Sequence, residues 1–187
     1  MLSVIIPTLN SERGLALTLP ILVPGAMSGL VREVVIVDGG STDNSLMIAD
    51  AAGCVLHAAT APLGRRLSEA AAAARSPWLM FVRPGTVLEP TWVDETARFI
   101  DDGAEPTAAV FRRSVPAQAR APAVREAVGL MAFGLFGRVS PSQGLVIGNS
   151  LYKQVGGHRA DVADTERDLL ARLGRRHILM LRSGART

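Results

Sequence analysis

The sequence predicts a single α/β domain in which helices flank a mostly parallel sheet. Short apolar runs alternate with helical stretches through the amino-terminal half of the chain. One of these runs, Val34–Val37, is made of branched residues with no polar alternation, which suits a strand covered on both faces. The 187 residues are the size of one ordinary domain and can bury a substantial core.

The composition is that of a globular protein, with 48% hydrophobic and 20% charged residues. The net charge of +3 gives no case for nucleic acid as a partner. Lys153 is the single lysine, and arginine favours phosphate and carboxylate partners. A compositional bias of the genome explains the arginine content better, because alanine is also abundant. Cys54 is the single cysteine, which excludes an internal disulfide and indicates a reducing, cytoplasmic location.

The first predicted strand lies within Met1–Thr8 and ends at Pro7. This stretch lacks the basic start and long apolar core of a signal peptide. Capping residues then begin a helix over residues 12–19, and Pro20 and Pro24 punctuate the chain after it.

Val34–Val37 is the second predicted strand, and Asp38 directly follows it. Open α/β sheets bind their ligands at the carboxyl ends of their strands, which is the position of Asp38. Gly39 and Gly40 let the backbone turn sharply and approach a ligand, and Ser41 or Thr42 can cap the next helix. A right-handed crossover between the two strands brings the end of the first strand and Asp38 to one crevice.

The alternation continues along the chain. We expect a strand at Gly53–Ala58, a helix over Leu67–Arg75, a strand at Trp78–Val82 and a helix from about Thr91 to Ile100. Arg65 and Arg66 precede the first of these helices and can clamp phosphate groups. Arginines at a helix end are, however, commonly only solvated.

Ser3–Asn10, Glu33–Asp43, and the alanine-rich helix followed by Trp78–Val82 together resemble the amino-terminal half of family 2 glycosyltransferases. The resemblance implies a GT-A fold, a UDP- or GDP-type nucleotide-diphospho-sugar donor and, usually, a divalent metal. It implies a donor-binding half at residues 2–100 and an acceptor and base half at residues 101–187. The candidate donor-binding residues are Pro7, Thr8, Asn10, Asp38, Gly39, Gly40, Arg65, Arg66 and Arg83.

The chain departs from the family pattern where the strand at Trp78–Val82 ends. Family members carry an Asp-x-Asp or His-Ala-Asp type motif there, whose last aspartate binds the metal that bridges the donor's phosphates. Here the positions are Arg83, Pro84 and Gly85. Magnesium and manganese need oxygen ligands, which these side chains do not supply, so the sequence predicts no conventional metal site at this point.

Two accounts of this departure stay open. In the first account, Arg83 with Arg65 or Arg66 offsets charge on the leaving diphosphate, which gives a metal-independent transferase. In the second account, catalysis has been lost and the domain is a nucleotide-binding or partner-binding module. A shift of the alignment, with Asp94 or Glu95 as the metal ligand, is a third reading, although the strand before Arg83 aligns without a gap.

The carboxyl-terminal half begins with a predicted strand at Ala108–Arg112 and a loop at Val115–Pro122. Residues 123–137 are the most apolar segment of the chain and are too short to span a bilayer. A core helix, an oligomer surface and an interfacial helix all fit this segment. The interfacial helix would give peripheral contact with the inner face of the membrane.

The resemblance continues after this segment. Gln143-Gly144 and Gly156-Gly157 stand where family members have a Gly-Asp-Gln-Gly turn and a helix that ends in Gly-Gly. Asp168–Leu173 matches the family's Asp-Leu-x-x-Arg-Leu helix, which puts Thr165 and Glu166 at the place of the Glu-Asp pair that precedes it.

This alignment makes Glu166 the first candidate for the base of an inverting transfer, with Asp164 and Asp168 as substitutes if the register slips. A partly desolvated carboxylate can take the proton of an attacking hydroxyl group. The alternative is that these acids only favour a helix start through its dipole. His158 is either a further acceptor contact or a surface histidine.

Overall fold

The computed structural model describes residues 1–103, 107–114 and 140–186. Within them, one sheet has the strand order β3-β2-β1-β4-β7-β6-β8-β5. The strands are β1 (Leu2–Thr8), β2 (Val31–Asp38), β3 (Val55–Ala58), β4 (Trp78–Phe81), β5 (Val87–Leu88), β6 (Ala108–Arg113), β7 (Leu145–Gly148) and β8 (Ile178–Arg186). The helices are α1 (Glu12–Met27), α2 (Ser45–Ala51), α3 (Leu63–Ala73), α4 (Trp92–Asp101), α6 (Asn149–Gln154) and α7 (Thr165–Leu173), with 3-10 turns η1 (Pro141–Gln143) and η2 (Arg175–His177).

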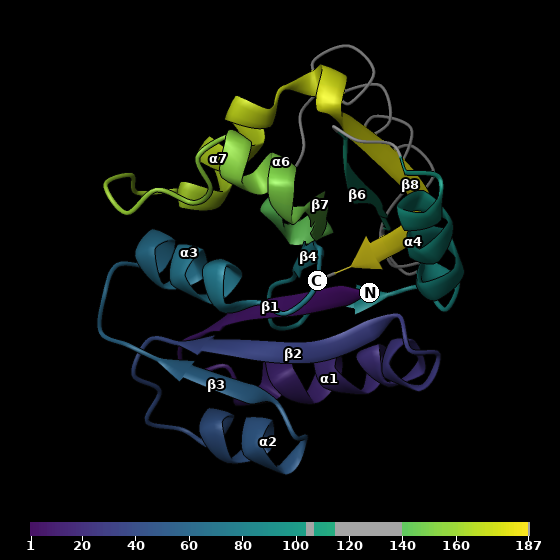
Figure 1. Ribbon diagram of the computed structural model, residues 1–187. Coiled ribbons are helices and arrows are strands. Elements are labelled where there is room, and N and C mark those ends of the chain that lie inside the picture. Colours follow the sequence, from purple (N-terminus) through teal and green to yellow (C-terminus); the bar gives the residue numbers. More distant parts are fainter. Residues whose placement is uncertain (104–106, 115–139, 187) are drawn as a thin grey trace, which may run out of the picture.

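Helices cover both faces of the sheet (Figure 1). The core on one face joins the strands to α1, α2 and α4, and the core on the other joins them to α3, α6 and α7. Strand β2 contributes to both, because Ile36 belongs to the first core and Val35 and Val37 to the second. The prediction of a doubly covered strand in an α/β domain is therefore confirmed.

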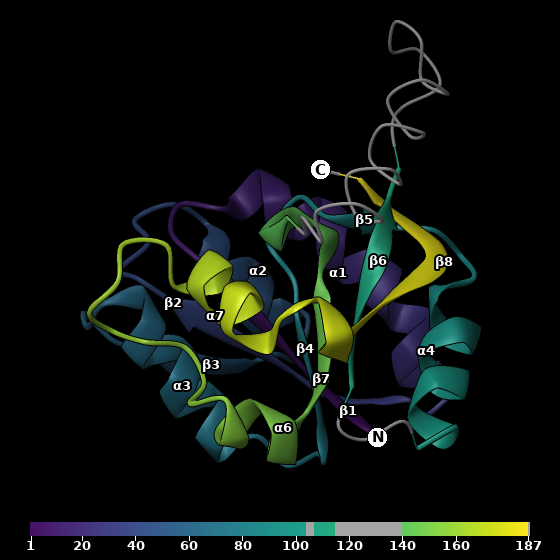
Figure 2. The ribbon, with the colours of Figure 1, turned by 90° about the horizontal axis from the view of Figure 1, so that it is seen from above.

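The sheet has a parallel half, and its remaining strands run in mixed directions. Strands β3, β2, β1 and β4 pair in parallel, whereas β7 is antiparallel to β4 and β6. Figure 2 shows β3 and β8 on opposite sides of the sheet, whose end strands are β3 and β5. Because β1, β2 and β4 are parallel neighbours, their carboxyl ends meet at one edge, and Thr8 is in register with Asp38.

Helix α1 is longer than the sequence predicts, because it continues through Pro20 and Pro24 to Met27. Both prolines lie on the exposed side of the helix, where water can bond the carbonyl groups that lose an N–H partner. Leu22 and Gly25 lie on its buried side. Burial of that side holds the helix together beyond the prolines.

Strand β1 also extends past its predicted end. Pro7 pairs with Val37 of β2, whereas the pairing with β4 stops at Ile5. Because β4 no longer pairs with β1 at Pro7, the missing N–H group of Pro7 does not remove a hydrogen bond between these two strands. Helix α3 starts earlier than predicted, so that Arg65 and Arg66 belong to its first turns.

Among the described residues, no helix is long and apolar enough to cross a membrane. The predicted loop at 115–122 and the apolar segment 123–137, with its predicted membrane contact, lie outside the described residues.

Candidate functional site

Asp38 is the centre of the turn that joins β2 to α2. Its Oδ1 accepts hydrogen bonds from the hydroxyl groups of Thr8 (2.8 Å) and Ser41 (2.5 Å). Its Oδ2 accepts the backbone N–H groups of Gly40 and Ser41, each at 2.8 Å. Burial opposes ionisation of Asp38, but these hydrogen bonds outweigh it and hold its pKa below the usual value. The predicted meeting of the β1 end with Asp38 is thus confirmed.

The loops after β1 and β2 hold each other through side chains. Asn10, whose φ of 49° is in the left-handed region, donates its N–H to Ser41 Oγ (2.8 Å) and accepts the N–H of Thr42 at Oδ1 (2.8 Å). Asp43 accepts hydrogen bonds from Glu12 and from both the N–H and hydroxyl groups of Ser45.

These contacts correct one detail of the sequence prediction. Neither Ser41 nor Thr42 caps α2, because their side chains bond Asp38 and Asn10 instead. Asn44 is the residue before the helix and makes no side-chain cap. The oxygen next to the helix start comes from Asp43, which accepts from Ser45 at Oδ1.

Arg66 lies against this turn from α3 and is 8% exposed. Its Nη1 donates to the Val37 carbonyl (3.0 Å) and its Nε to the Ala61 carbonyl (2.9 Å). A Cβ on Gly39 would stand 3.0 Å from Nη2 of Arg66, so glycine lets the guanidinium group approach the turn. The structure therefore brings Gly39 and Arg66 together.

Arg65 takes a different direction. Its side chain is 65% exposed, and its Nε donates to Glu69 Oε1 one turn along α3 at 2.8 Å. That is the solvated arrangement that is common for arginines on a helix surface. Only Arg66 of the two contacts the turn around Asp38.

The Arg83–Thr86 segment after β4 is a tight turn with Pro84 in second position and Gly85 in third, closed by a hydrogen bond from Thr86 N–H to the Arg83 carbonyl (3.1 Å). Gly85 has a φ of 89°, as a type II turn requires of its third residue. Thr18 of α1 accepts the N–H of Gly85 at Oγ1 (2.9 Å). The turn is therefore anchored on α1.

The side chain of Arg83 reaches Glu166 in the first turn of α7. Its Nε donates to Glu166 Oε2 at 2.8 Å, and its Nη2 makes a second, shorter contact with the same oxygen. The hydrogen bond to Glu166 raises the pKa of Arg83, against the opposing effect of burial. Oε1 of Glu166 accepts no hydrogen bond from the described part of the chain.

The other two candidate carboxylates of α7 have structural partners. Asp164 precedes the helix and accepts the N–H of Arg167 at Oδ1 (3.1 Å), which makes it the N-cap. Asp168 accepts from Arg172 Nε at 2.8 Å, and Arg172 also donates to the carbonyl groups of Val155 and Gly157 after α6. Glu166 is the one of the three that reaches the end of β4.

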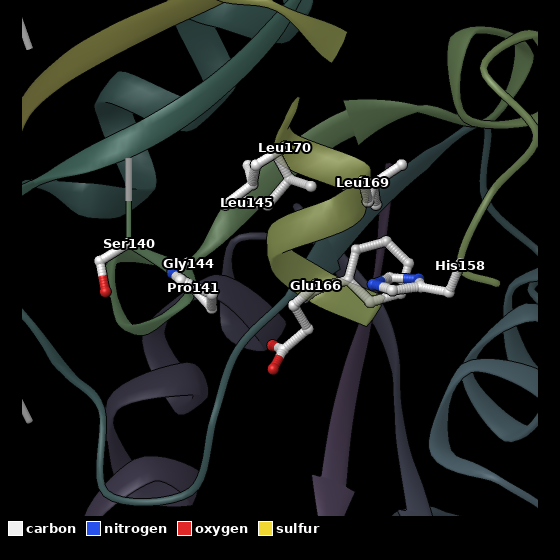
Figure 3. A pocket seen from close by; sticks show the side chains of 9 residues that line it. Ser140, Pro141, Gly144, Leu145, His158, Glu166, Leu169 and Leu170 are labelled. Carbon is white, nitrogen blue, oxygen red and sulfur yellow. The ribbon is translucent and has the colours of Figure 1, made fainter. Parts of the chain in front are cut away.

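A pocket opens beside Glu166 (Figure 3). Its walls include the apolar side chains of Phe81, Leu145 and Leu170. Figure 3 shows the carboxylate of Glu166 pointing away from the two leucines, with Pro141 on one side and His158 on the other. The pocket is open on one side, and its space of about 280 Å³ includes open solvent.

His158 is buried in this pocket wall, so the alternative of a surface histidine is wrong. Tyr152 accepts the backbone N–H of His158 (3.0 Å), and its hydroxyl lies 2.9 Å from Nδ1. The ring of Phe81 packs edge-on against the imidazole, with 4.7 Å between centroids. Burial, assisted by the charge of Arg172, lowers the pKa of His158 to about 3, and burial raises that of Tyr152 to about 12.

A divalent cation does not fit the end of β4. The side chains there are a guanidinium group that is paired with Glu166, a proline and a glycine, none of which donates an oxygen. Nor do the residues that the structure describes contain any group of three or more His, Cys, Asp or Glu side chains able to hold a metal ion. Asp94 and Glu95 lie in the first turn of α4, and Glu95 accepts the N–H of Ser183.

Sequence reasoning named Arg83 and Glu166 separately but did not predict their contact. It also missed Tyr152 as the partner of His158, and Thr18 as the anchor of the Arg83 turn. A local signal existed only for the turn itself, since Arg-Pro-Gly-Thr is a typical type II turn sequence. The contacts of this segment with Glu166 and Thr18 join residues that are far apart in the chain.

Comparison with known families and structures gives a consistent result. The model of the family described as Glycosyl transferase family 2 matches residues 3–143. No curated protein matches the sequence significantly.

Among solved structures, glucosyl-3-phosphoglycerate synthase from Mycobacterium tuberculosis in complex with Mn2+, UDP and glucosyl-3-phosphoglycerate is similar in fold, with a TM-score of 0.70 and 22% identity. The match covers 96% of this chain and 68% of that chain. S. aureus TarS (residues 1–349) has a TM-score of 0.76 and 19% identity, over 100% of this chain and 60% of that chain.

Proposed function

The chain belongs to glycosyl transferase family 2 and has a GT-A fold, and we propose that it transfers a sugar from a nucleotide-diphospho-sugar donor to a hydroxyl group of an acceptor. The observation that carries the proposal is the contact between Arg83 and Glu166. It puts a cation and a carboxylate together at the carboxyl end of a central parallel strand, where α/β sheets bind ligands. The neighbour from M. tuberculosis was solved with UDP-glucose and Mn2+, which supports a nucleotide-sugar donor.

We assign the donor's nucleotide to the edge of the sheet where β1 and β2 end. Pro7 and Thr8 end β1 there and Asn10 follows them, and the Gly39-Gly40 turn follows β2, whose last residue is in register with Thr8. A carboxylate has about four lone-pair positions, and Asp38 uses four for protein donors. Asp38 therefore acts on the donor by fixing the shape of the turn.

Two of the three candidate arginines lie at the carboxyl ends of β2 and β4. Arg66 lies at the turn around Asp38, with its Nη2 beside Gly39, and Arg83 lies at the end of β4. A guanidinium group can bond two phosphate oxygens at once. We assign the diphosphate to these two groups, while Arg65 stays on the solvated surface of α3.

Glu166 is the proposed base of an inverting transfer. Its carboxylate takes the proton of the acceptor hydroxyl while that oxygen forms a bond with the anomeric carbon. The bond between the anomeric carbon and the diphosphate oxygen breaks, and the nucleoside diphosphate leaves with the electron pair. Arg83 offsets the charge that grows on this leaving group, and Glu166 then releases its proton to solvent.

The proposed reaction is independent of a metal ion, because the side chains at the end of β4 do not fit one. The competing candidate is a nucleotide-binding or partner-binding module without catalysis. The observation in its favour is the same ion pair, since a base that is held by an arginine is not free to act. The cytoplasmic location and the membrane contact through residues 123–137 stay predictions.

Titration of the purified protein with UDP and GDP, with and without Mn2+, tests the proposal. We expect binding that does not need the metal and that weakens in Arg83→Ala. The variant Glu166→Gln should retain donor binding and lose transfer, measured as release of nucleoside diphosphate. Binding without turnover, for any donor and acceptor tried, would favour the binding module, and no nucleotide binding under any condition would exclude the transferase.

A further inference from the structure

The ion pair joins two residues to which the proposed mechanism gives different substrates. Arg83 is assigned to the donor's diphosphate and Glu166 to the acceptor's hydroxyl group. In the structure, however, Nε and Nη2 of Arg83 both point at Oε2 of Glu166. The proposed donor site and the proposed base therefore share one cation.

We propose, on the basis of the proposed function, that the donor's diphosphate and Glu166 compete for Arg83. In the free enzyme the guanidinium group holds Glu166, and in the donor complex it turns to the diphosphate. Glu166 is then released to accept the proton of the acceptor hydroxyl only when a donor is in place. Arg83 would thus couple the donor site to the base.

The surroundings of the pair indicate which partner moves. The side chain of Arg83 is 42% exposed, whereas that of Glu166 is 13% exposed. Glu166 belongs to α7, which is buried through Leu169 and Leu173. An exposed arginine changes rotamer easily, since its side chain has four rotatable bonds. Arg83 can therefore turn while its backbone stays bonded to α1 through Gly85.

Charge makes the two contacts compete. One guanidinium group carries a single positive charge, whereas the carboxylate and the diphosphate are both anions. With both on Arg83, the two anions repel each other across a partly desolvated site. Asp164 adds a further negative charge close enough to raise the pKa of Arg83. Neutralising Glu166 should therefore strengthen, rather than weaken, the binding of a diphosphate.

The experiment is a double-mutant cycle on nucleotide binding, measured by isothermal titration calorimetry with UDP, GDP and the matching nucleosides as probes. The proteins are the unmodified chain, Glu166→Gln, Arg83→Gln and the double variant. Asp161→Asn is the matched control, because it removes an exposed negative charge from the loop before α7.

We expect Glu166→Gln to bind the diphosphates about three- to tenfold more tightly, as the loss of one competing charged hydrogen bond predicts. The nucleosides should bind equally to both proteins, because they lack the phosphates. In the Arg83→Gln background the same change should have no effect, and Asp161→Asn should change affinity less than about twofold.

Unchanged or weaker diphosphate binding by Glu166→Gln would overturn the competition and leave the proposed function standing, because the donor would still bind. Tightening of the same size in the Arg83→Gln background would also overturn it. Thermal unfolding checks that each variant is folded. If Glu166→Gln does not fold, Glu166→Ala serves in its place, since it removes both the charge and the contact with Arg83, and the same tightening is expected.

Discussion

Gly64 in the first turn of α3 faces the backbone carbonyl of Arg159 so closely that a Cβ on Gly64 would stand 1.9 Å from that oxygen. The same Cβ would stand 2.8 Å from the hydroxyl oxygen of Thr165, the first residue of α7. This contact fixes the start of α7 against the helix that carries Arg66. The position of Glu166 therefore depends on a glycine in the amino-terminal half of the chain.

The first prediction is that Gly64→Ala destabilises the protein. A methyl group cannot fit against a backbone carbonyl, so the loop at Arg159 or the helix must move, at a cost of about 1–3 kcal/mol in the free energy of unfolding. Chemical denaturation measures this cost. Arg65→Ala, at the next position but with an exposed side chain, should leave stability nearly unchanged. Equal effects of the two substitutions would contradict this account of the contact.

The second prediction separates the two neighbouring arginines. Arg66→Lys should lower the free energy of unfolding by about 1–3 kcal/mol, because one ammonium group cannot replace the planar fork that bonds both the Val37 and the Ala61 carbonyl. Arg65→Lys keeps an exposed cation beside Glu69 and should be neutral. Urea unfolding of both variants checks the difference. A neutral Arg66→Lys would mean that its two carbonyl bonds contribute little.

Local patterns were sufficient for most elements of the fold. The run Val34–Val37 lies between two helical layers, and its branched side chains encode that burial directly. The extent of α1 could not be predicted in the same way. Pro20 and Pro24 are strong local stop signals, and only the packing of the buried side of the helix overrides them. Strand β8 was not predicted from the sequence, because it is formed by pairing with β6, which lies more than sixty positions away in the chain.

The candidate site was predictable only in its parts. The turn at Asp38 follows from adjacent residues, since an acid, two glycines and a hydroxyl residue can bond one another locally. Arg83 and Glu166 are 83 positions apart, and no local pattern tells which arginine will meet which acid. In the sequence, Asp164 and Asp168 are carboxylates just as Glu166 is. Only their positions on α7 make Asp164 the N-cap and Asp168 the partner of Arg172, and leave Glu166 to contact Arg83.

The third prediction concerns metal removal. EDTA should leave the affinity for UDP and GDP unchanged within about twofold, because the end of β4 offers a guanidinium group and no oxygen ligand. Added Mn2+ should not restore binding to Arg83→Ala. Calorimetry before and after chelation measures both effects. A tenfold loss of affinity in EDTA would show that a metal site exists and that Arg83 does not take its place.

The fourth prediction is a pH dependence of stability caused by His158. Tyr152 accepts the backbone N–H of His158, so its hydroxyl hydrogen is free to donate to Nδ1, which suits a neutral imidazole. Burial keeps the pKa of His158 at about 3 in the folded protein, whereas an unfolded histidine titrates near 6.5. Between these values the unfolded chain binds one more proton than the folded one.

The stabilising contribution of the neutral His158 is therefore complete above about pH 6.5 and is lost as the pH falls towards 3, by up to about 1.4 kcal/mol per pH unit. The measurement is urea unfolding from pH 7.5 to 4.5 for the unmodified protein and for His158→Gln, whose side chain does not titrate. As the pH falls, the unmodified protein should lose stability relative to His158→Gln, so its stability advantage should shrink. If that advantage is small at pH 7.5, the variant should become the more stable protein in acid. His177→Gln, at an exposed position, is the control and should keep a constant difference of less than about 0.5 kcal/mol. Parallel curves for the unmodified protein and His158→Gln would show that His158 takes up protons equally in the folded and unfolded chain, and that its contact with Tyr152 does not depend on a neutral ring.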